Sequence, residues 1–104
     1  MKGKKMDAMC HEPLQAGPAV VIVDMGSKER KTERFENLPE DVRYKPQLRT
    51  CNEVERTVMV PVAEIRVSPV DNAGKLVQKE QASSLLIEYF DKDGKVLEVV
   101  RMAK

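Results

Sequence analysis

The stretch that decides the fold is "SSLLIEYFDKDGKVLEVVRM", residues 83–102. Two apolar runs flank the turn sequence DKDGK, in which Asp and Gly supply the conformations that a tight turn needs. Runs of this length that are rich in Leu, Ile and Val are typical of strands. The stretch therefore predicts a β-hairpin. We interpret DKDGK as its turn, because a calcium-binding loop would need further oxygen ligands at fixed spacing.

Upstream segments extend this hairpin into a sheet. "ERTVMVPVAEIRVSPV", residues 55–70, predicts a strand that Pro61 interrupts. Because proline cannot donate to a strand ladder, we expect this strand at a sheet edge or with a bulge. "DNAG", residues 71–74, predicts a turn, and "KLVQKEQ", residues 75–81, a return strand. The C-terminal half is thus predicted to be a meander of four strands.

The first half of the chain begins with a clear strand and then becomes ambiguous. "AVVIVD", residues 19–24, is a β-branched run that predicts a strand buried on both faces. Residues 28–38 fit either a helix or a polar strand that pairs back on residues 19–25. Such a strand suits an exposed sheet edge, where charge blocks further pairing. The strand is favoured, because a helix would place Glu29 and Glu33 at the repulsive i,i+4 spacing. "LPEDV", residues 38–42, predicts one helical turn or a tight turn.

The composition bounds the fold class. A chain of 104 residues with 41% apolar and 34% charged residues is typical of a single globular domain. We expect an N-terminal arm over residues 1–17 and one β-rich domain over residues 18–104. The predicted architecture is mainly β, a small antiparallel sandwich or partly open barrel with at most one or two short helical turns.

The charge balance and the cysteine content bear on the binding partners and the cellular compartment. The 18 Lys and Arg residues nearly balance the 17 Asp and Glu residues, so neither a polyanion-binding field nor a membrane-binding surface is indicated. The basic start is not followed by the apolar segment of a signal peptide, which predicts a cytoplasmic protein. A disulfide between Cys10 and Cys51 would stabilise the fold by about 4 kcal/mol in the chain-entropy model. In a reducing compartment we instead predict two free thiols.

The segment "MDAMCHEP", residues 6–13, carries soft metal ligands. Thioether, thiolate and imidazole groups suit Cu(I) or Zn(II). The candidate metal ligands are Met6, Met9, Cys10, His11 and Cys51. Adjacent side chains diverge, however, so Cys10 and His11 would not converge on one ion unless the backbone bends. Packing of the arm onto the domain is the favoured interpretation, because Met and free Cys commonly fill gaps in a core.

Cations lie beside aromatic residues between positions 34 and 44. Arg34 with Phe35, and Arg43 with Tyr44, place groups that stack on bases next to groups that contact phosphates. These four residues define a candidate site for single-stranded nucleic acid. Acidic residues in the same region would repel a phosphate backbone, so a solvated edge is the favoured interpretation.

No motif supports an enzyme, because the phosphate-binding, nucleophile-elbow and zinc-protease patterns are absent from the sequence. We therefore predict no cofactor and a non-catalytic function. The leading hypothesis is a protein-binding or assembly module that forms a homodimer through a strand edge. Glu64 and Arg66 mark that edge on the predicted strand of residues 55–70. Nucleic-acid binding and soft-metal binding are the alternatives.

Overall fold

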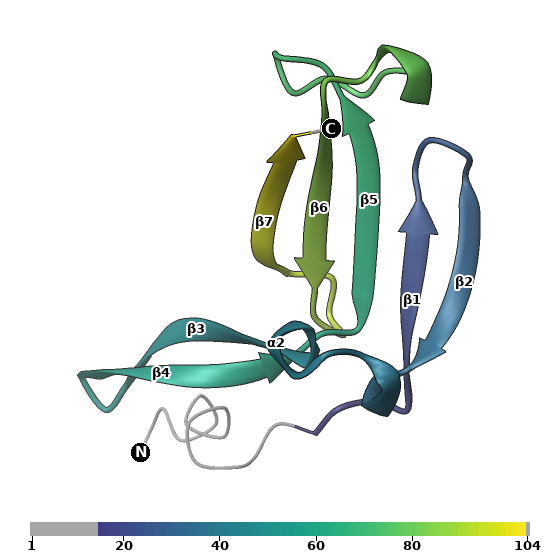
Figure 1. Ribbon diagram of the computed structural model, residues 1–104. Helices are drawn as coiled ribbons and strands as arrows, with labels where there is room; N and C mark the ends of the chain where they lie inside the picture. The colour runs from purple at the N-terminus through teal and green to yellow at the C-terminus, as the bar shows by residue number, and fades with distance from the viewer. Residues whose placement is uncertain (1–14, 104) are drawn as a thin grey trace.

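The computed structural model describes residues 15–103 and shows a mainly β protein, as the sequence predicts. Five strands form a mixed sheet in the order β2-β1-β5-β6-β7, and β3 pairs with β4 in a separate antiparallel hairpin (Figure 1). The sheet is not closed into a barrel. The strands are β1 (Ala19–Asp24), β2 (Glu29–Arg34), β3 (Tyr44–Cys51), β4 (Val54–Pro61), β5 (Glu64–Val70), β6 (Ser84–Phe90) and β7 (Val96–Ala103). The helical segments are η2 (Phe35–Asn37), α2 (Glu40–Arg43) and η3 (Lys79–Gln81).

The predicted hairpin of residues 83–102 is confirmed, since β6 and β7 pair antiparallel across the DKDGK turn. The Asp91 carboxylate accepts hydrogen bonds from the backbone N–H groups of Asp93 and Lys95, at 2.9 and 2.8 Å. Gly94 has φ +85°, which a residue with a side chain rarely adopts. Residues 71–75 form the same turn, in which the Asp71 carboxylate accepts hydrogen bonds from the backbone N–H groups of Ala73 and Lys75. Both carboxylates are therefore used to close turns.

Residues 19–34 form the predicted hairpin of β1 and β2. The strand interpretation of residues 28–38 is confirmed as far as Arg34, and α2 supplies the predicted helical turn. The prediction that residues 19–24 are buried on both faces is wrong, because only Val20 in this strand is fully buried. The other five residues of β1 are half-buried, because the core covers only one end of one face of the sheet.

Two predictions for the C-terminal half are wrong. Residues 55–70 form two strands in different sheets, since β4 ends at Pro61 and β5 begins at Glu64. β5 is the central strand, parallel to β1 and antiparallel to β6. Residues 75–81 form no return strand and make only a bridge from Leu76 to Val70 before η3. β6 pairs directly with β5, so the antiparallel meander has three strands.

The core lies where the hairpin of β3 and β4 and helix α2 cross one end of the five-stranded sheet (Figure 1). Its buried apolar residues come from four strands and the link between β4 and β5. They are Val20, Val60, Val62, Ile65 and Leu97. The far end of the same face carries apolar residues outside this cluster, including Pro69 and Leu85. The core therefore covers only part of the sheet.

Lys45 fixes the hairpin to the sheet. Its side chain is nearly buried, and its ammonium group donates to the Asp41 carbonyl at 3.1 Å. The ammonium nitrogen also lies 3.4 Å from the Glu98 carboxylate and 4.2 Å from the centre of the Tyr89 ring. These contacts join β3 to α2, β6 and β7 through one cation.

Candidate interaction site

The structure brings together part of the candidate nucleic-acid site. The rings of Phe35 and Tyr44 meet edge to face, with centroids 5.4 Å apart. Phe35 also packs against the core cluster, so part of its surface serves the fold. Arg34 forms an exposed ion pair with Glu36 at 2.5 Å. Arg43 has a buried Nε atom without a hydrogen-bond partner among residues 15–103. Binding of nucleic acid at these residues stays a prediction.

Glu64 and Arg66 do not lie at a sheet edge, which corrects the sequence prediction. Both belong to β5, between β1 and β6, because the chain breaks at Pro61 and begins a new strand. Their side chains form an ion pair at 2.6 Å, and the Arg66 guanidinium lies 4.4 Å from the centre of the Phe90 ring. The hydrogen bond to Glu64 raises the pKa of Arg66 above its ordinary value. This pair is part of the polar face of the sheet.

Most of the candidate metal ligands, namely Met6, Met9, Cys10 and His11, lie outside the described residues. Cys51 lies inside them, is nearly buried and is disulfide-bonded. The prediction of a free thiol at this position is therefore wrong, and a disulfide sulfur is not the thiolate that a soft metal prefers. Within residues 15–103 no group of three or more His, Cys, Asp or Glu side chains is arranged to hold a metal ion.

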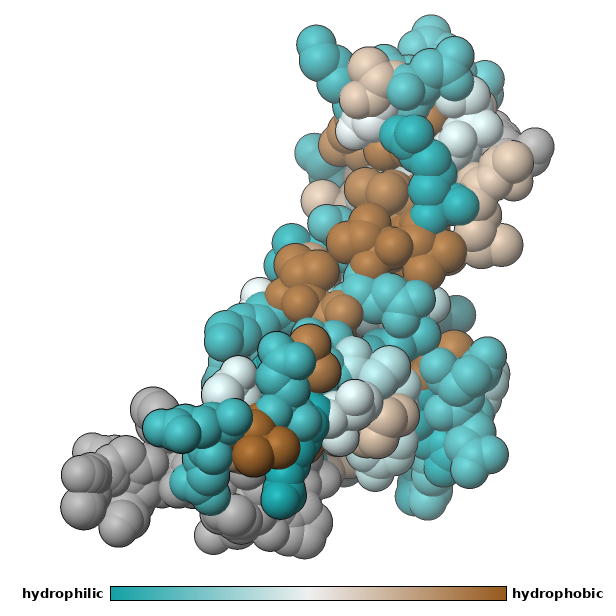
Figure 2. Space-filling model, turned by 90° about the vertical axis from the view of Figure 1, so that its left-hand side faces the viewer, coloured by the Kyte–Doolittle hydropathy of each residue, from teal (hydrophilic) through white to brown (hydrophobic). Residues whose placement is uncertain are grey.

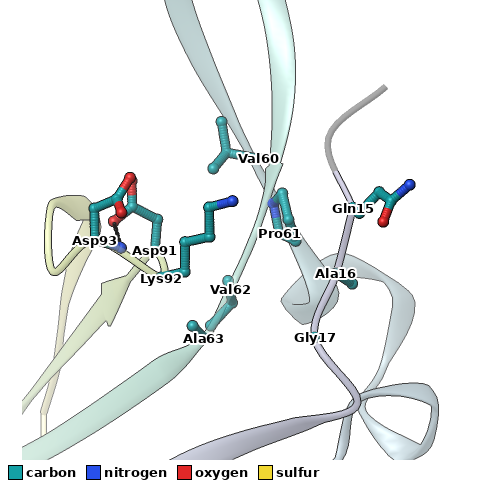
Figure 3. Close-up of a pocket in the computed structure, with 10 residues that line it drawn as sticks. All are labelled: Gln15, Ala16, Gly17, Val60, Pro61, Val62, Ala63, Asp91, Lys92 and Asp93. Carbon is teal, nitrogen blue, oxygen red and sulfur yellow. Dashed lines mark hydrogen bonds between the residues drawn. The ribbon is translucent and has the colours of Figure 1, made fainter. Parts of the chain in front are cut away.

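A pocket of about 310 Å³ lies where three segments meet (Figure 3). Its walls are residues 15–17, residues 60–63 and residues 91–93. The Asp91 carboxylate is already used by the turn, and Lys92 supplies the one cation of the lining. Among residues 15–103, the lining contains no thiol, imidazole or hydroxyl group.

Among residues 15–103, the feature best suited to binding is the edge of β7 that pairs with no other described strand. β7 is the last strand of the sheet order, and its side chains Val96, Val99 and Met102 are about half exposed, at 51%, 51% and 52%. Seen from the side of β7 and the hairpin, apolar side chains form a band along the molecule (Figure 2). An exposed apolar strand edge is a surface on which another strand can pair.

The backbone groups that face this edge can be identified. The Gln47 side chain, which approaches from β3, donates to the Leu97 carbonyl at 2.7 Å. Backbone groups alternate in direction along a strand, so Val99 and Arg101 present their N–H and C=O groups on the same side as Leu97. On β6, the Phe90 carbonyl accepts from Ala63 on the β5 side, which fits this alternation. Gln47 therefore caps one end of the edge, and Val99 and Arg101 remain for pairing.

The opposite edge, β2, differs in composition. Its sequence is ERKTER, with five charged residues in six positions. Charged side chains at an edge oppose further pairing, which is a common protection of natural sheets. The charged sequence of residues 29–34 predicts this protection of β2, whereas the apolar edge of β7 was not predicted. The signal was the apolar run "VLEVV", residues 96–100, which repeats the apolar character of a core strand at exposed positions.

Comparisons of the chain with protein-family models, curated proteins and solved structures find no match. In residues 15–103, no helix is long and apolar enough to cross a membrane.

Proposed function

We propose that this protein is a non-catalytic assembly module that binds a protein partner by accepting its strand at the β7 edge. The observation that carries the proposal is the free apolar edge of β7, with the outward backbone groups of Val99 and Arg101. Added strands gain backbone hydrogen bonds along the edge, while alternate side chains provide specificity. Here Val99 provides an apolar contact and Arg101 a cationic one.

The face of the sheet that holds the core supports the same role. Strand register places Pro69, Leu85 and Met102 in one row on that face, beyond the end that α2 and the hairpin cover. A partner strand beside β7 would extend this row and bury Met102 further. Burial of apolar area contributes roughly 25 cal/mol per Å². The free energy of binding therefore comes in part from covering apolar surface that the monomer leaves exposed.

The experiment compares two proline substitutions at opposite edges. Val99→Pro removes an N–H group that faces outward from β7, so the monomer loses no ladder hydrogen bond. Thr32→Pro is the matched control on β2. The Phe35 N–H donates inward to the Pro18 carbonyl, so by alternation the Thr32 N–H also faces outward. Far-ultraviolet circular dichroism checks that both variants keep the sheet.

The probe is a fluorescein-labelled peptide with the sequence of residues 95–103, and the readout is its fluorescence anisotropy. We expect the peptide to bind the full chain and Thr32→Pro equally, and to bind folded Val99→Pro at least about tenfold more weakly, because a backbone hydrogen bond is lost and the proline ring obstructs the edge. Equal binding to Val99→Pro, or no binding to the unmodified chain, would contradict the proposal.

A further inference from the structure

We infer that the strand accepted by β7 is β7 of a second copy of this chain, antiparallel, with Val100 on the two-fold axis. This inference rests on the proposed function, because it names the partner of the same edge. It is carried by the order of charges along β7 and by the position of Gln47.

Symmetry restricts the possible registers. A two-fold axis that relates neighbouring antiparallel strands is perpendicular to the sheet, and residues opposite each other point to the same face. Side chains alternate between faces, so an odd-numbered residue can lie opposite only an odd-numbered residue of the partner. Each register is therefore defined by the one residue that lies on the axis.

Repulsion between like charges excludes two of the four central registers of β7, and two remain. Glu98 on the axis would face the partner's Glu98, and Arg101 on the axis would face the partner's Arg101; like charges directly opposite are destabilising. With Val100 on the axis, Val99 lies opposite the partner's Arg101. Glu98 then lies opposite the partner's Met102. With Val99 on the axis, no like charges meet either.

Gln47 separates the two remaining registers. With Val99 on the axis, the outer hydrogen bonds would use the backbone of Leu97, whose carbonyl already accepts from Gln47 at 2.7 Å. With Val100 on the axis, Leu97 lies opposite only the partner's Ala103 at the end of the strand, and the central hydrogen bonds use Val99 and Arg101 alone. Two residues in each copy then exchange N–H and C=O bonds with no loss of the Gln47 contact. The structure thus favours Val100 on the axis.

The resulting assembly is closed. Two five-stranded sheets would join into one sheet of ten strands, in which Ile87 and Val100 of each copy form a continuous apolar row.

The outer edges of this sheet would then be the two β2 strands. With Lys31 on an axis, Glu29 would face the partner's Glu33. With Thr32 on an axis, Arg30 would face the partner's Arg34. The other four registers place a charged residue of β2 opposite itself, so β2 opposes further growth and the assembly stops at a dimer.

The test uses opposite charges at one exposed position. In the dimer, Val99→Glu places a carboxylate opposite the partner's Arg101, twice by symmetry, whereas Val99→Lys places an ammonium group there. Within the monomer, the residue opposite position 99 is Glu88. The monomer therefore favours Val99→Lys, and the dimer favours Val99→Glu. A change in folding stability alone cannot produce the expected order of dimer affinities.

The measurement is sedimentation equilibrium of the full chain and both variants, in a concentration series up to about 1 mM, because one added strand gives a weak dimer. We expect dimerisation about fivefold tighter for Val99→Glu and about fivefold weaker for Val99→Lys, from two cross-strand charge pairs per dimer. Weaker dimerisation of both variants would overturn the register, since this result indicates that Val99 lies on the axis. A full chain that stays monomeric while the β7 peptide binds would overturn self-pairing but leave the proposed function standing.

Discussion

Replacing Lys45 with methionine tests how the hairpin of β3 and β4 is held on the sheet. The side chain keeps its apolar stem in this variant and loses its cation. Three interactions are lost together: the hydrogen bond to the Asp41 carbonyl at 3.1 Å, the ion pair with Glu98 at 3.4 Å and the contact with the Tyr89 ring at 4.2 Å.

The magnitude follows from the exposure of each partner. A hydrogen bond from a charged donor contributes about 1.5–3 kcal/mol, but water can replace the donor because Asp41 is exposed. The cation–π contact contributes about 1 kcal/mol. The ion pair contributes less than about 1 kcal/mol, since the Glu98 side chain is 40% exposed. Removing a nearly buried ammonium group also recovers part of its desolvation cost. We expect a net loss of about 1–3 kcal/mol in the free energy of unfolding.

The assay is urea unfolding at pH 7, followed by far-ultraviolet circular dichroism. Lys92→Met is the matched control, because Lys92 is an exposed lysine on a turn and its loss should change stability by less than about 0.5 kcal/mol. Glu98→Gln should cost less than about 1 kcal/mol, since it removes only the ion pair. The reasoning is refuted if Lys45→Met is as stable as Lys92→Met, or if Glu98→Gln costs as much as Lys45→Met.

Three further predictions concern single positions. Gly94→Ala should cost about 1 kcal/mol in unfolding free energy, because φ +85° strains alanine while no atom lies near the added Cβ; chemical denaturation that gave no loss would contradict this. Burial acts to raise the pKa of Asp24, but hydrogen bonds from the Gly26 and Ser27 backbone outweigh it and lower the pKa below its ordinary value. Because the folded pKa is lowered, the carboxylate stabilises the fold above the unfolded value of about 3.9, and this contribution disappears as the pH falls through the folded pKa. Asp24→Asn should therefore be less stable than the unmodified chain near pH 7, with a difference that shrinks below about pH 4; a difference independent of pH would count against it. For Cys51, we expect mass spectrometry of the unreduced chain to show no free thiol, and thermal unfolding at a lower temperature once reductant is added; an equal melting temperature would mean that the bond does not stabilise the fold.

Local signals predicted the turns and the paired strands well. The sequence of residues 83–102 contains both strands and their turn within 20 positions, so no distant contact is needed to recognise the hairpin. The charged segment 29–34 was predicted as an edge strand because its charges fit neither a helix nor a core. Both features depend on residues that are close together in the sequence.

The predictions that failed depend on long-range contacts. The sequence predicts that Pro61 interrupts one strand, whereas Pro61 ends β4 and β5 enters a different sheet. β5 became the central strand through parallel pairing with β1, about 40 positions earlier in the sequence, and such pairing has no local signature. Consequently Glu64 and Arg66 were placed at an edge, and the true edge at β7 was not recognised. The state of Cys51 was also inferred from an expected compartment rather than from geometry.

The most direct test of the central claim is residue-resolved amide hydrogen exchange of the full chain, measured by NMR at low and high protein concentration. The account predicts that the outward N–H groups of Val99 and Arg101 exchange quickly in dilute solution and become protected as the concentration rises. The Thr32 amide on β2 should exchange quickly at both concentrations. Unchanged exchange at Val99 and Arg101, or protection that appears at Thr32 instead, would contradict pairing through the β7 edge.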